Sequence, residues 1–506
     1  MDGSIEMKRF KKVLIANRGE IAIRVARSLR LMGIDSVTLY TDEEVDLPHA
    51  RFGDESINLG SGPLAETYLN IDRLVGLCQE MGVDAVHPGY GFLSERAPFA
   101  LALEAAGIKL IGPPVAAMES MGDKKTSKEI MEAAGIPLIP GYHGSRQEPD
   151  FLYEEAKRIG FPALIKASAG GGGKGMRIVN AEGEFLEALE GAKREAMNAF
   201  GDDKVLIEKF ITDPRHIEVQ VMSDQHGQHF HFWERECSIQ RRYQKIIEET
   251  PSPALSPALR QEICENAAKI AQTMKYEGAG TVEYILDKDN SFYFLEMNTR
   301  LQVEHPITEM VTGFDLVELQ LKVAMGEKLA FTQEDIKQSG HALEVRLYAE
   351  DPDNGFLPAT GKIACVGQNQ QIGVRLDTGY EDGNAVTVSF DPMLAKLIVH
   401  APNRSASIAK MMTALEDHPF LGLKTNREYL FRILRHKSFI EGVTFTHFVE
   451  TFKDDLGPIA LSKLDQALAI AAYHLFQEDS LSQKVHQSGF RSSVWQEVNG
   501  LRIGQS

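Results

Sequence analysis

Apolar and polar positions near the start of the chain alternate between strand-like runs and helical spacing. VLIAN (residues 13–17) is a short apolar run, and GEIAIRVARSLRLMG (19–33) repeats its apolar residues every three or four positions. Further short apolar runs lie at 35–42, 83–91 and 108–114. Strands that alternate with helices predict a parallel α/β unit of Rossmann-like type over residues 8–122. Its first turn, ANRGE, lacks the G-x-G-x-x-G fingerprint, which argues against dinucleotide binding.

The remaining pattern predicts three more units, so we expect a multidomain protein of mixed α/β and α+β class. Residues 123–330 combine predicted helices at 124–135 and 257–276 with strand-like runs between 204 and 251, which indicates a largely antiparallel sheet with covering helices. A third α/β unit is predicted over 340–450. Residues 455–506 predict a helix and a hairpin around Asn499-Gly500, and we interpret them as an entry to a following domain.

Composition and charge narrow the choice of partners. Of the 506 residues, 43% are hydrophobic and 25% charged, as in ordinary globular proteins. The formal net charge of -18 argues against nucleic acid or an anionic membrane as the main partner. No run approaches the roughly 20 apolar residues that span a bilayer. The four cysteines form no C-x-x-C pair, and the chain starts without an apolar signal segment, so we expect a cytoplasmic protein.

A glycine run gives the strongest chemical signal. ASAGGGGKGM (167–176) lies between two strand-like segments, and its run of four glycines, 170–173, is flanked by Lys166 and Lys174. Glycines such as Gly171 and Gly172 allow backbone amides to approach phosphate closely, so we expect them in an ATP-binding lid over about 139–207. A flexible linker is the plainer alternative. The Walker A pattern is absent, which excludes the P-loop fold.

Two carboxylates are predicted to face each other across a hairpin. The strand-like runs in GTVEYILDKDNSFYFLEMN flank Asp289-Asn290, which suits a two-residue turn. That turn places Glu283 opposite Glu296, with Asn298 on the same face. Two carboxylates and an amide oxygen are hard ligands, and they predict a Mg²⁺ site beside ATP phosphates, where Mn²⁺ could substitute. Two solvated surface glutamates are the alternative.

The following residues alternate a cation, an amide and a carboxylate. If NTRLQVEH (298–305) is extended, Arg300, Gln302 and Glu304 share one strand face. A guanidinium matches a small carboxylate-like anion, and a neighbouring carboxylate can accept its proton. The pattern predicts a bicarbonate site with its base, although a surface salt-bridge stripe would have the same spacing.

Together these motifs resemble one family. IKASAGGGGKGM, RHIEVQ, ECSIQRRYQKIIEE, GAGTVEY, EMNTRLQVEHPITEM and EVRLYAEDP resemble the biotin carboxylase family of the ATP-grasp superfamily, over about residues 8–450. The resemblance implies a pre-ATP-grasp domain, a central ATP-grasp domain with a mobile glycine-rich lid, and a biotin carboxylase C-terminal domain. One departure is Tyr243, where the family segment usually reads RRHQK.

The resemblance also implies roles for individual residues. ATP would be held at its phosphates by two lysines, at adenine by the segment 208–211, and at the ribose by two polar side chains; these residues are Lys124, Lys166, Glu208, Lys209, Ile211, His216 and Gln240. Bicarbonate would be bound by Lys245, Arg300, Gln302 and the Val303 backbone, and deprotonated by Glu304. Arg346 would stabilise the biotin enolate.

The reaction implied is ATP-dependent formation of carboxyphosphate, followed by carboxylation of biotin. The chain has no A-M-K-M biotinylation motif, so biotin is expected on a carrier domain, with a carboxyltransferase subunit as a further partner. The pattern is most similar to acyl-CoA carboxylase α-subunits of the methylcrotonyl-CoA and propionyl-CoA type. Self-association as a homodimer or in a larger complex is also implied. Two alternatives are another ATP-grasp ligase, such as a carbamoyl-phosphate synthetase module, and a non-catalytic nucleotide-binding scaffold.

Overall fold

The N-terminal segment forms a five-stranded parallel sheet. The computed structural model describes residues 9–167, 176–200, 202–242, 244–367 and 371–458. All strand pairs are parallel, as the alternating pattern predicted; the strand order is β3-β2-β1-β4-β5, and β3 was not predicted from the sequence. The strands are β1 (Lys12–Ile15), β2 (Asp35–Tyr40), β3 (Glu55–Asn58), β4 (Ala85–His87) and β5 (Lys109–Leu110), and the helices are α1 (Gly19–Leu31), α2 (Ile71–Glu80), α3 (Ala97–Ala105) and α4 (Val115–Gly122). Ile21, Val25 and Leu29 recur every fourth residue of α1 and are buried, which explains its docking.

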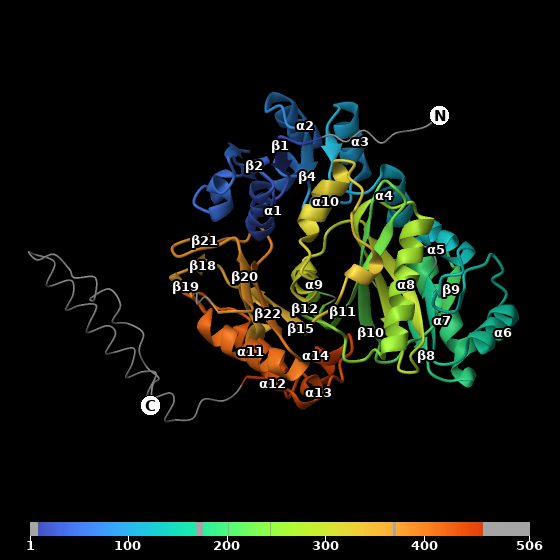
Figure 1. Cartoon of the computed structure of the whole chain (residues 1–506). Coiled ribbons are helices and arrows are strands. Elements are labelled where there is room, and N and C mark those ends of the chain that lie inside the picture. Colours follow the sequence, from blue (N-terminus) through green and yellow to red (C-terminus); the bar gives the residue numbers. More distant parts are fainter. Residues whose placement is uncertain (1–8, 168–175, 201, 243, 368–370, 459–506) are drawn as a thin grey trace, which may run out of the picture. The chain divides into compact units, whose positions relative to one another are not determined.

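An eight-stranded antiparallel sheet carries most of the remaining chain (Figure 1). Its order is β14-β13-β10-β11-β12-β15-β22-β20. The strands are β10 (Arg215–Ser223), β11 (His229–Arg241), β12 (Gln244–Thr250), β13 (Gly278–Leu286), β14 (Phe292–Asn298), β15 (His341–Tyr348), β20 (Val374–Thr378) and β22 (Met393–Ala401). Because β12 pairs with β15, the sheet runs without a break from the predicted second unit into the predicted third.

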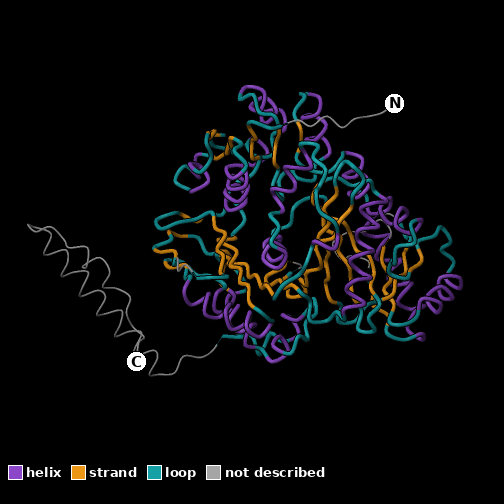
Figure 2. Tube along the Cα trace, viewed as in Figure 1, coloured by secondary structure: helices purple, strands orange, loops and turns teal. Residues whose placement is uncertain are grey.

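Helices cover this sheet, and short strand pairs decorate its C-terminal part (Figure 2). The helices are α8 (Pro257–Thr273), α9 (His305–Thr312), α10 (Leu316–Ala324), α11 (Arg404–Asp417), α12 (Arg427–Arg435), α13 (Lys437–Ile440) and α14 (Phe448–Thr451); the short strands are β16 (Glu350–Asp351), β17 (Leu357–Pro358), β18 (Gly361–Lys362), β19 (Cys365–Val366), β21 (Ala385–Val386) and β23 (Phe420–Leu421). Helix α8 begins where predicted, with the Ser256 side chain accepting from the Leu259 amide.

A separate four-stranded sheet, ordered β6-β9-β7-β8, lies within the predicted lid region. Its elements are β6 (Gly141–Tyr142), α6 (Pro149–Ile159), β7 (Ala163–Ala167), β8 (Arg177–Val179), α7 (Phe185–Phe200) and β9 (Val205–Lys209); α5 (Lys124–Ala133) precedes it. Leu152, Phe185 and Leu189 pack both helices onto this sheet. The small sheet therefore has a core of its own.

Two further predictions concern the C-terminal extension and membrane-spanning segments. The predicted helix and hairpin of the extension at 455–506 lie outside the described residues after position 458. Among the described residues, we find no helix with the length and apolar content needed to cross a membrane.

Candidate active site

Lys245 is the centre of a buried cluster of charges. It lies on β12, and its Nζ is 2.5 Å from a Glu218 carboxylate oxygen, 2.9 Å from Glu283 and 2.7 Å from Glu304. Burial lowers the pKa of Lys245, but the three carboxylates outweigh burial and hold its pKa well above the ordinary value. The ammonium is therefore charged at neutral pH and can bind an anion.

Glu283 faces Glu296 as predicted, although the predicted turn was wrong. The loop is one residue longer than the expected Asp289-Asn290 turn: the Asp287 amide donates to the Ser291 carbonyl, and Asn290 has a φ of 68°. A register shift between Glu283 and Tyr284 absorbs that extra residue, so that Glu283 pairs with Glu296. Two local errors in the predicted pairing therefore cancel.

Glu283 collects polar partners that suit a hard cation. Its carboxylate accepts from the Asn298 amide at 2.8 Å and the Gln302 amide at 3.3 Å, and lies 3.1 Å from His216 Nε2. Burial raises the pKa of Glu283, but Lys245 and His216 reverse that effect and hold it below the ordinary value. An ionised Glu283, a neighbouring amide and Glu296 directly across the hairpin offer the oxygen donors that Mg²⁺ takes.

The segment 300–304 was predicted as a strand, and this was wrong. Residues 300–302 are irregular, and Glu304 is the residue before α9. Arg300 still donates to Gln302 Oε1 and to Asn298 Oδ1, each at 3.2 Å, and its Nε lies 2.9 Å from Glu95. The Pro306 ring favours the first turn of a helix over a continued strand, which explains the difference.

Glu304 is held between two cations. Its carboxylate lies 2.7 Å from Lys245 and 3.0 Å from Arg346 on β15, and Arg346 also donates to Glu248 at 2.6 Å. Burial raises the pKa of Glu304, but Lys245, Arg346 and Arg235 together overcome that effect and hold the pKa well below its ordinary value. Glu304 is therefore ionised, as a base must be, and it becomes more basic when an anion shares its cations.

The residues predicted to contact ATP, which we call the nucleotide group, make separate contacts, and His216 also lies beside Glu283 of the Lys245 cluster. Lys166 ion-pairs with Glu208, and Lys209 lies 2.9 Å from Asp287. Ile211 is buried, and Gln240 Nε2 lies 3.1 Å from His216 Nδ1. Lys124 begins α5. The predictions for Gly171, Gly172 and Tyr243 lie outside the described residues.

Several members of the cluster were missed from the sequence. Glu218 contacts Lys245 and also Arg235, which is fully buried. Glu248 pairs with Arg346. Outside the cluster, Lys128 lies 3.0 Å from Glu208, one of the residues predicted to contact ATP. A signal existed for Glu218 alone, because RHIEVQ places it two residues after His216 and hence on the same strand face.

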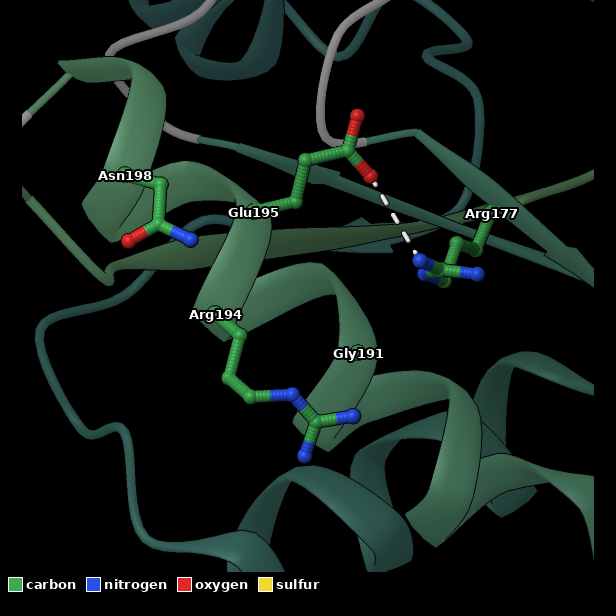
Figure 3. A pocket seen from close by; sticks show the side chains of 5 residues that line it. All are labelled: Arg177, Gly191, Arg194, Glu195 and Asn198. Carbon is green, nitrogen blue, oxygen red and sulfur yellow. Dashed lines mark hydrogen bonds and ion pairs between the residues drawn. The ribbon is translucent and has the colours of Figure 1, made fainter.

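A cavity lies away from this cluster, on the surface of the small sheet (Figure 3). Its volume is about 470 Å³, and it is lined by residues of β8 and α7, among them Arg177 and Arg194. Arg177 points toward Glu195, with their charged atoms 3.5 Å apart. None of the residues predicted for the site lines it.

A parallel N-terminal unit, a small separate sheet and a buried lysine–carboxylate cluster on a large antiparallel sheet define an ATP-grasp ligase. Three family models match the chain: the biotin carboxylase N-terminal domain over residues 9–118, the carbamoyl-phosphate synthase L chain ATP binding domain over 123–332, and the biotin carboxylase C-terminal domain over 344–451. The chain belongs to the biotin carboxylase family, and is thus an enzyme of the ligase class.

Relatives agree with this assignment. The chain is 46% identical to the methylcrotonoyl-CoA carboxylase subunit alpha, mitochondrial, of Mus musculus, over 98% of this chain and 71% of that protein. It is 45% identical to the propionyl-CoA carboxylase alpha chain of Ruegeria pomeroyi, over 93% and 72%. The biotin carboxylase domain dimer of Hydrogenobacter thermophilus 2-oxoglutarate carboxylase, solved with MgADP, ADP and bicarbonate, is 43% identical with a TM-score of 0.79, covering 90% of this chain and 100% of that one.

Proposed function

We propose that this chain activates bicarbonate with ATP and carboxylates biotin on a carrier domain, within an acyl-CoA carboxylase. The observation that carries the proposal is the convergence of Lys245, Glu304 and Arg346, two cations that flank one buried carboxylate. A carbamoyl-phosphate synthetase module or a non-catalytic scaffold would share the ATP-grasp fold. The two flanking biotin carboxylase domains and the relatives favour the biotin reaction instead.

Bicarbonate would bind between the cluster and the segment that precedes α9. Lys245, Arg300, the Gln302 amide and the Val303 backbone N–H supply donors for its oxygens. Glu304 would accept its proton, and the bicarbonate oxygen would attack the γ-phosphorus of ATP to give carboxyphosphate and ADP. When the anion draws Lys245 toward itself, Glu304 loses part of the attraction that depresses its pKa. Bicarbonate binding would therefore raise the pKa of Glu304 and make it a stronger base.

ATP would lie beside Glu208, Lys209, Ile211, His216 and Gln240, with Lys124, Lys166, Gly171 and Gly172 at its phosphates. Glu283, Glu296 and Asn298 would hold Mg²⁺, and Mn²⁺ as a substitute. The ion supplies charge neutralisation for the phosphates when it is bound. Because carboxyphosphate is short-lived in water, closure of the lid over these residues would protect it from hydrolysis.

Biotin would enter on the side of Arg346. Carboxyphosphate breaks into CO₂ and phosphate, phosphate removes the proton from the ureido nitrogen, and that nitrogen captures CO₂. The guanidinium of Arg346 would stabilise the enolate oxygen of biotin, because it is fixed by Glu248 and Glu304 on both sides. Removing the proton from biotin is the demanding step, and a preorganised cation lowers its barrier.

The partners would be a biotin carrier domain and a carboxyltransferase subunit that selects the acyl-CoA. Self-association is supported by the dimer named for the Hydrogenobacter thermophilus domain. We propose a cytoplasmic location, and the four free cysteines are compatible with a reducing compartment.

The test is ADP release by the purified chain with MgATP. We expect release to require bicarbonate and to rise when free biotin is added. ADP release that depends on neither bicarbonate nor biotin would indicate an ATP-grasp ligase that acts on another carboxylate. Release that depends on bicarbonate but never on biotin, or on the biotinylated carrier, would remove biotin from the reaction.

A further inference from the structure

Lys396 is a fully buried lysine close to the proposed bicarbonate segment. It lies on β22, and its Nζ donates to the Val303 carbonyl oxygen at 2.9 Å. The same Nζ lies 3.1 Å from Glu20 Oε1 and 3.9 Å from Asp377 Oδ2. One ammonium thus joins the start of α1, the segment before α9 and two strands of the large sheet.

The position of Lys396 is costly for the sheet. It pairs across strands with Arg346, and like charges directly opposite each other destabilise a sheet. Burying an ammonium is also unfavourable unless it is paired, and an apolar residue of similar size would be the ordinary choice at this place. Glu20 and Asp377 offset the charge. The hydrogen bond to Val303 is the contact that this arrangement makes possible.

The neighbouring peptide is pinned as well. His305 is buried, and its Nδ1 lies 2.8 Å from the Gln302 carbonyl oxygen, which can only accept, so Nδ1 carries the hydrogen. The Gln302–Val303 peptide bears the Val303 N–H, and the Val303–Glu304 peptide leads to the proposed base. Side chains therefore fix the peptide planes on both sides of Val303.

Glu20 can contact Lys396 because the start of α1 approaches the backbone at Gly379 closely. A Cβ on Gly379 would lie 2.7 Å from the Cα of Gly19, so only glycine at 379 lets the start of α1 come this near. Glu20 also accepts a hydrogen bond from the Tyr90 hydroxyl. The N-terminal unit is thereby tied to the segment that carries Glu304.

We propose that Lys396 is a positioning residue for bicarbonate activation: it holds the Val303–Glu304 peptide so that the Val303 N–H and the Glu304 carboxylate keep their places. The proposal rests on the function proposed above. Catalytic groups must be held to within a fraction of an ångström, and a displacement of about 1 Å costs roughly 100-fold in rate. Lys396 itself touches neither substrate.

The test compares Lys396→Met with the double variant Lys396→Met/Glu20→Gln. The single variant leaves Glu20 without its cation and is expected to lose stability for that reason alone, whereas the double variant removes both charges. We expect the double variant to recover thermal stability yet to keep a kcat for bicarbonate-dependent ADP release roughly 100-fold below the wild type. Its Kd for MgADP, measured by calorimetry, is expected within about two-fold of the wild-type value, since Lys396 lies outside the nucleotide group.

A second readout follows the backbone directly. Hydrogen exchange at the amides of residues 303–305 is expected to accelerate in the double variant. Lys410→Met is the matched control, because Lys410 also donates to a carbonyl of β22, that of His400 at 2.8 Å, far from Glu304 in the chain. This control should keep both kcat and the exchange rates at 303–305.

The outcomes separate the two proposals. A stable double variant with wild-type kcat, or with unchanged exchange at 303–305, would overturn the role of Lys396 and leave the proposed function intact. A wild-type chain without bicarbonate-dependent ADP release would overturn the proposed function and the role of Lys396 together.

Discussion

At the scale of single residues, the site works by placing one carboxylate among cations. Glu304 lies between Lys245 and Arg346, and the buried Arg235 on β11 adds further positive charge. Lys245 and Arg346, which depress its pKa most, are also the proposed contacts of bicarbonate and of biotin. The ion pairs that exist before substrate binds therefore already hold the charged groups in the positions that the reaction requires.

Glu304→Gln is expected to reduce bicarbonate-dependent ADP release by roughly 100-fold or more, because the amide cannot accept the proton. Nucleotide affinity should remain, since Glu304 lies outside the nucleotide group. The measurement is steady-state ADP release together with the Kd for MgADP. Near-normal release would remove Glu304 from the role of base.

Glu344→Gln is the matched control for that substitution. Glu344 is fully buried on β15, and neither of its carboxylate oxygens has a hydrogen-bond partner among the described residues. Burial raises the pKa of Glu344 well above its ordinary value, and Glu344→Gln breaks no side-chain hydrogen bond among the described residues. We expect activity within a few-fold of the wild type.

At the scale of elements, a hairpin and a helix start deliver the site. The β13–β14 hairpin uses a longer turn and a register shift to bring Glu296 opposite Glu283. Helix α9 begins directly after Glu304, where the partial positive charge of the helix end favours a carboxylate. The two elements thereby supply Glu283 and Glu304, which both contact Lys245.

Asn290 tests the hairpin geometry. Its φ of 68° lies in the left-handed region, which asparagine and glycine tolerate and β-branched residues do not. Asn290→Val is expected to destabilise the protein by about 1–2 kcal/mol, whereas Asn290→Gly should be nearly neutral. Thermal unfolding of the two variants measures this difference. Equal melting temperatures would mean that the turn adopts another conformation in solution.

At the scale of the whole molecule, buried ionisable groups couple stability to pH. His87 is fully buried, with its Nε2 3.3 Å from Gln320 Oε1 and its Nδ1 accepting from the Gly89 amide at 3.0 Å. Burial lowers the pKa of His87 to about 4. The neutral ring satisfies both contacts, whereas a protonated Nδ1 would face the Gly89 N–H.

Acid should therefore destabilise the protein partly through His87. Its folded-state pKa is below the unfolded value, so its contribution is complete above about pH 6.5 and is lost as the pH falls toward 4, by about 2 kcal/mol at pH 5. His87→Gln is expected to lose less stability than the wild type between pH 7.5 and pH 5, as measured by urea midpoints. Parallel curves for the wild type and the variant would contradict the prediction.

Local sequence periodicity determined much of this protein. The alternation at 13–114 predicted the parallel sheet, and the two apolar runs around Asp289-Asn290 predicted that Glu283 faces Glu296 with Asn298 beside it. The RHIEVQ and EVRLYAEDP motifs pointed to their residues only through a family resemblance. Periodicity predicts the face of a strand because that face depends on residues two apart in the chain, whereas the Glu283–Glu296 pairing also required the longer turn and the register shift to compensate for each other.

The tertiary structure alone decided which distant residues meet. Lys245 lies on β12, Glu304 directly before α9 and Arg346 on β15. Lys396 on β22 contacts Glu20 near the start of the chain. Strand order, the register shift near Glu283 and the helix start at 305 set these contacts, and each results from packing against elements far away in sequence. No local pattern records such pairings, because their free energy arises only when the sheets and helices assemble.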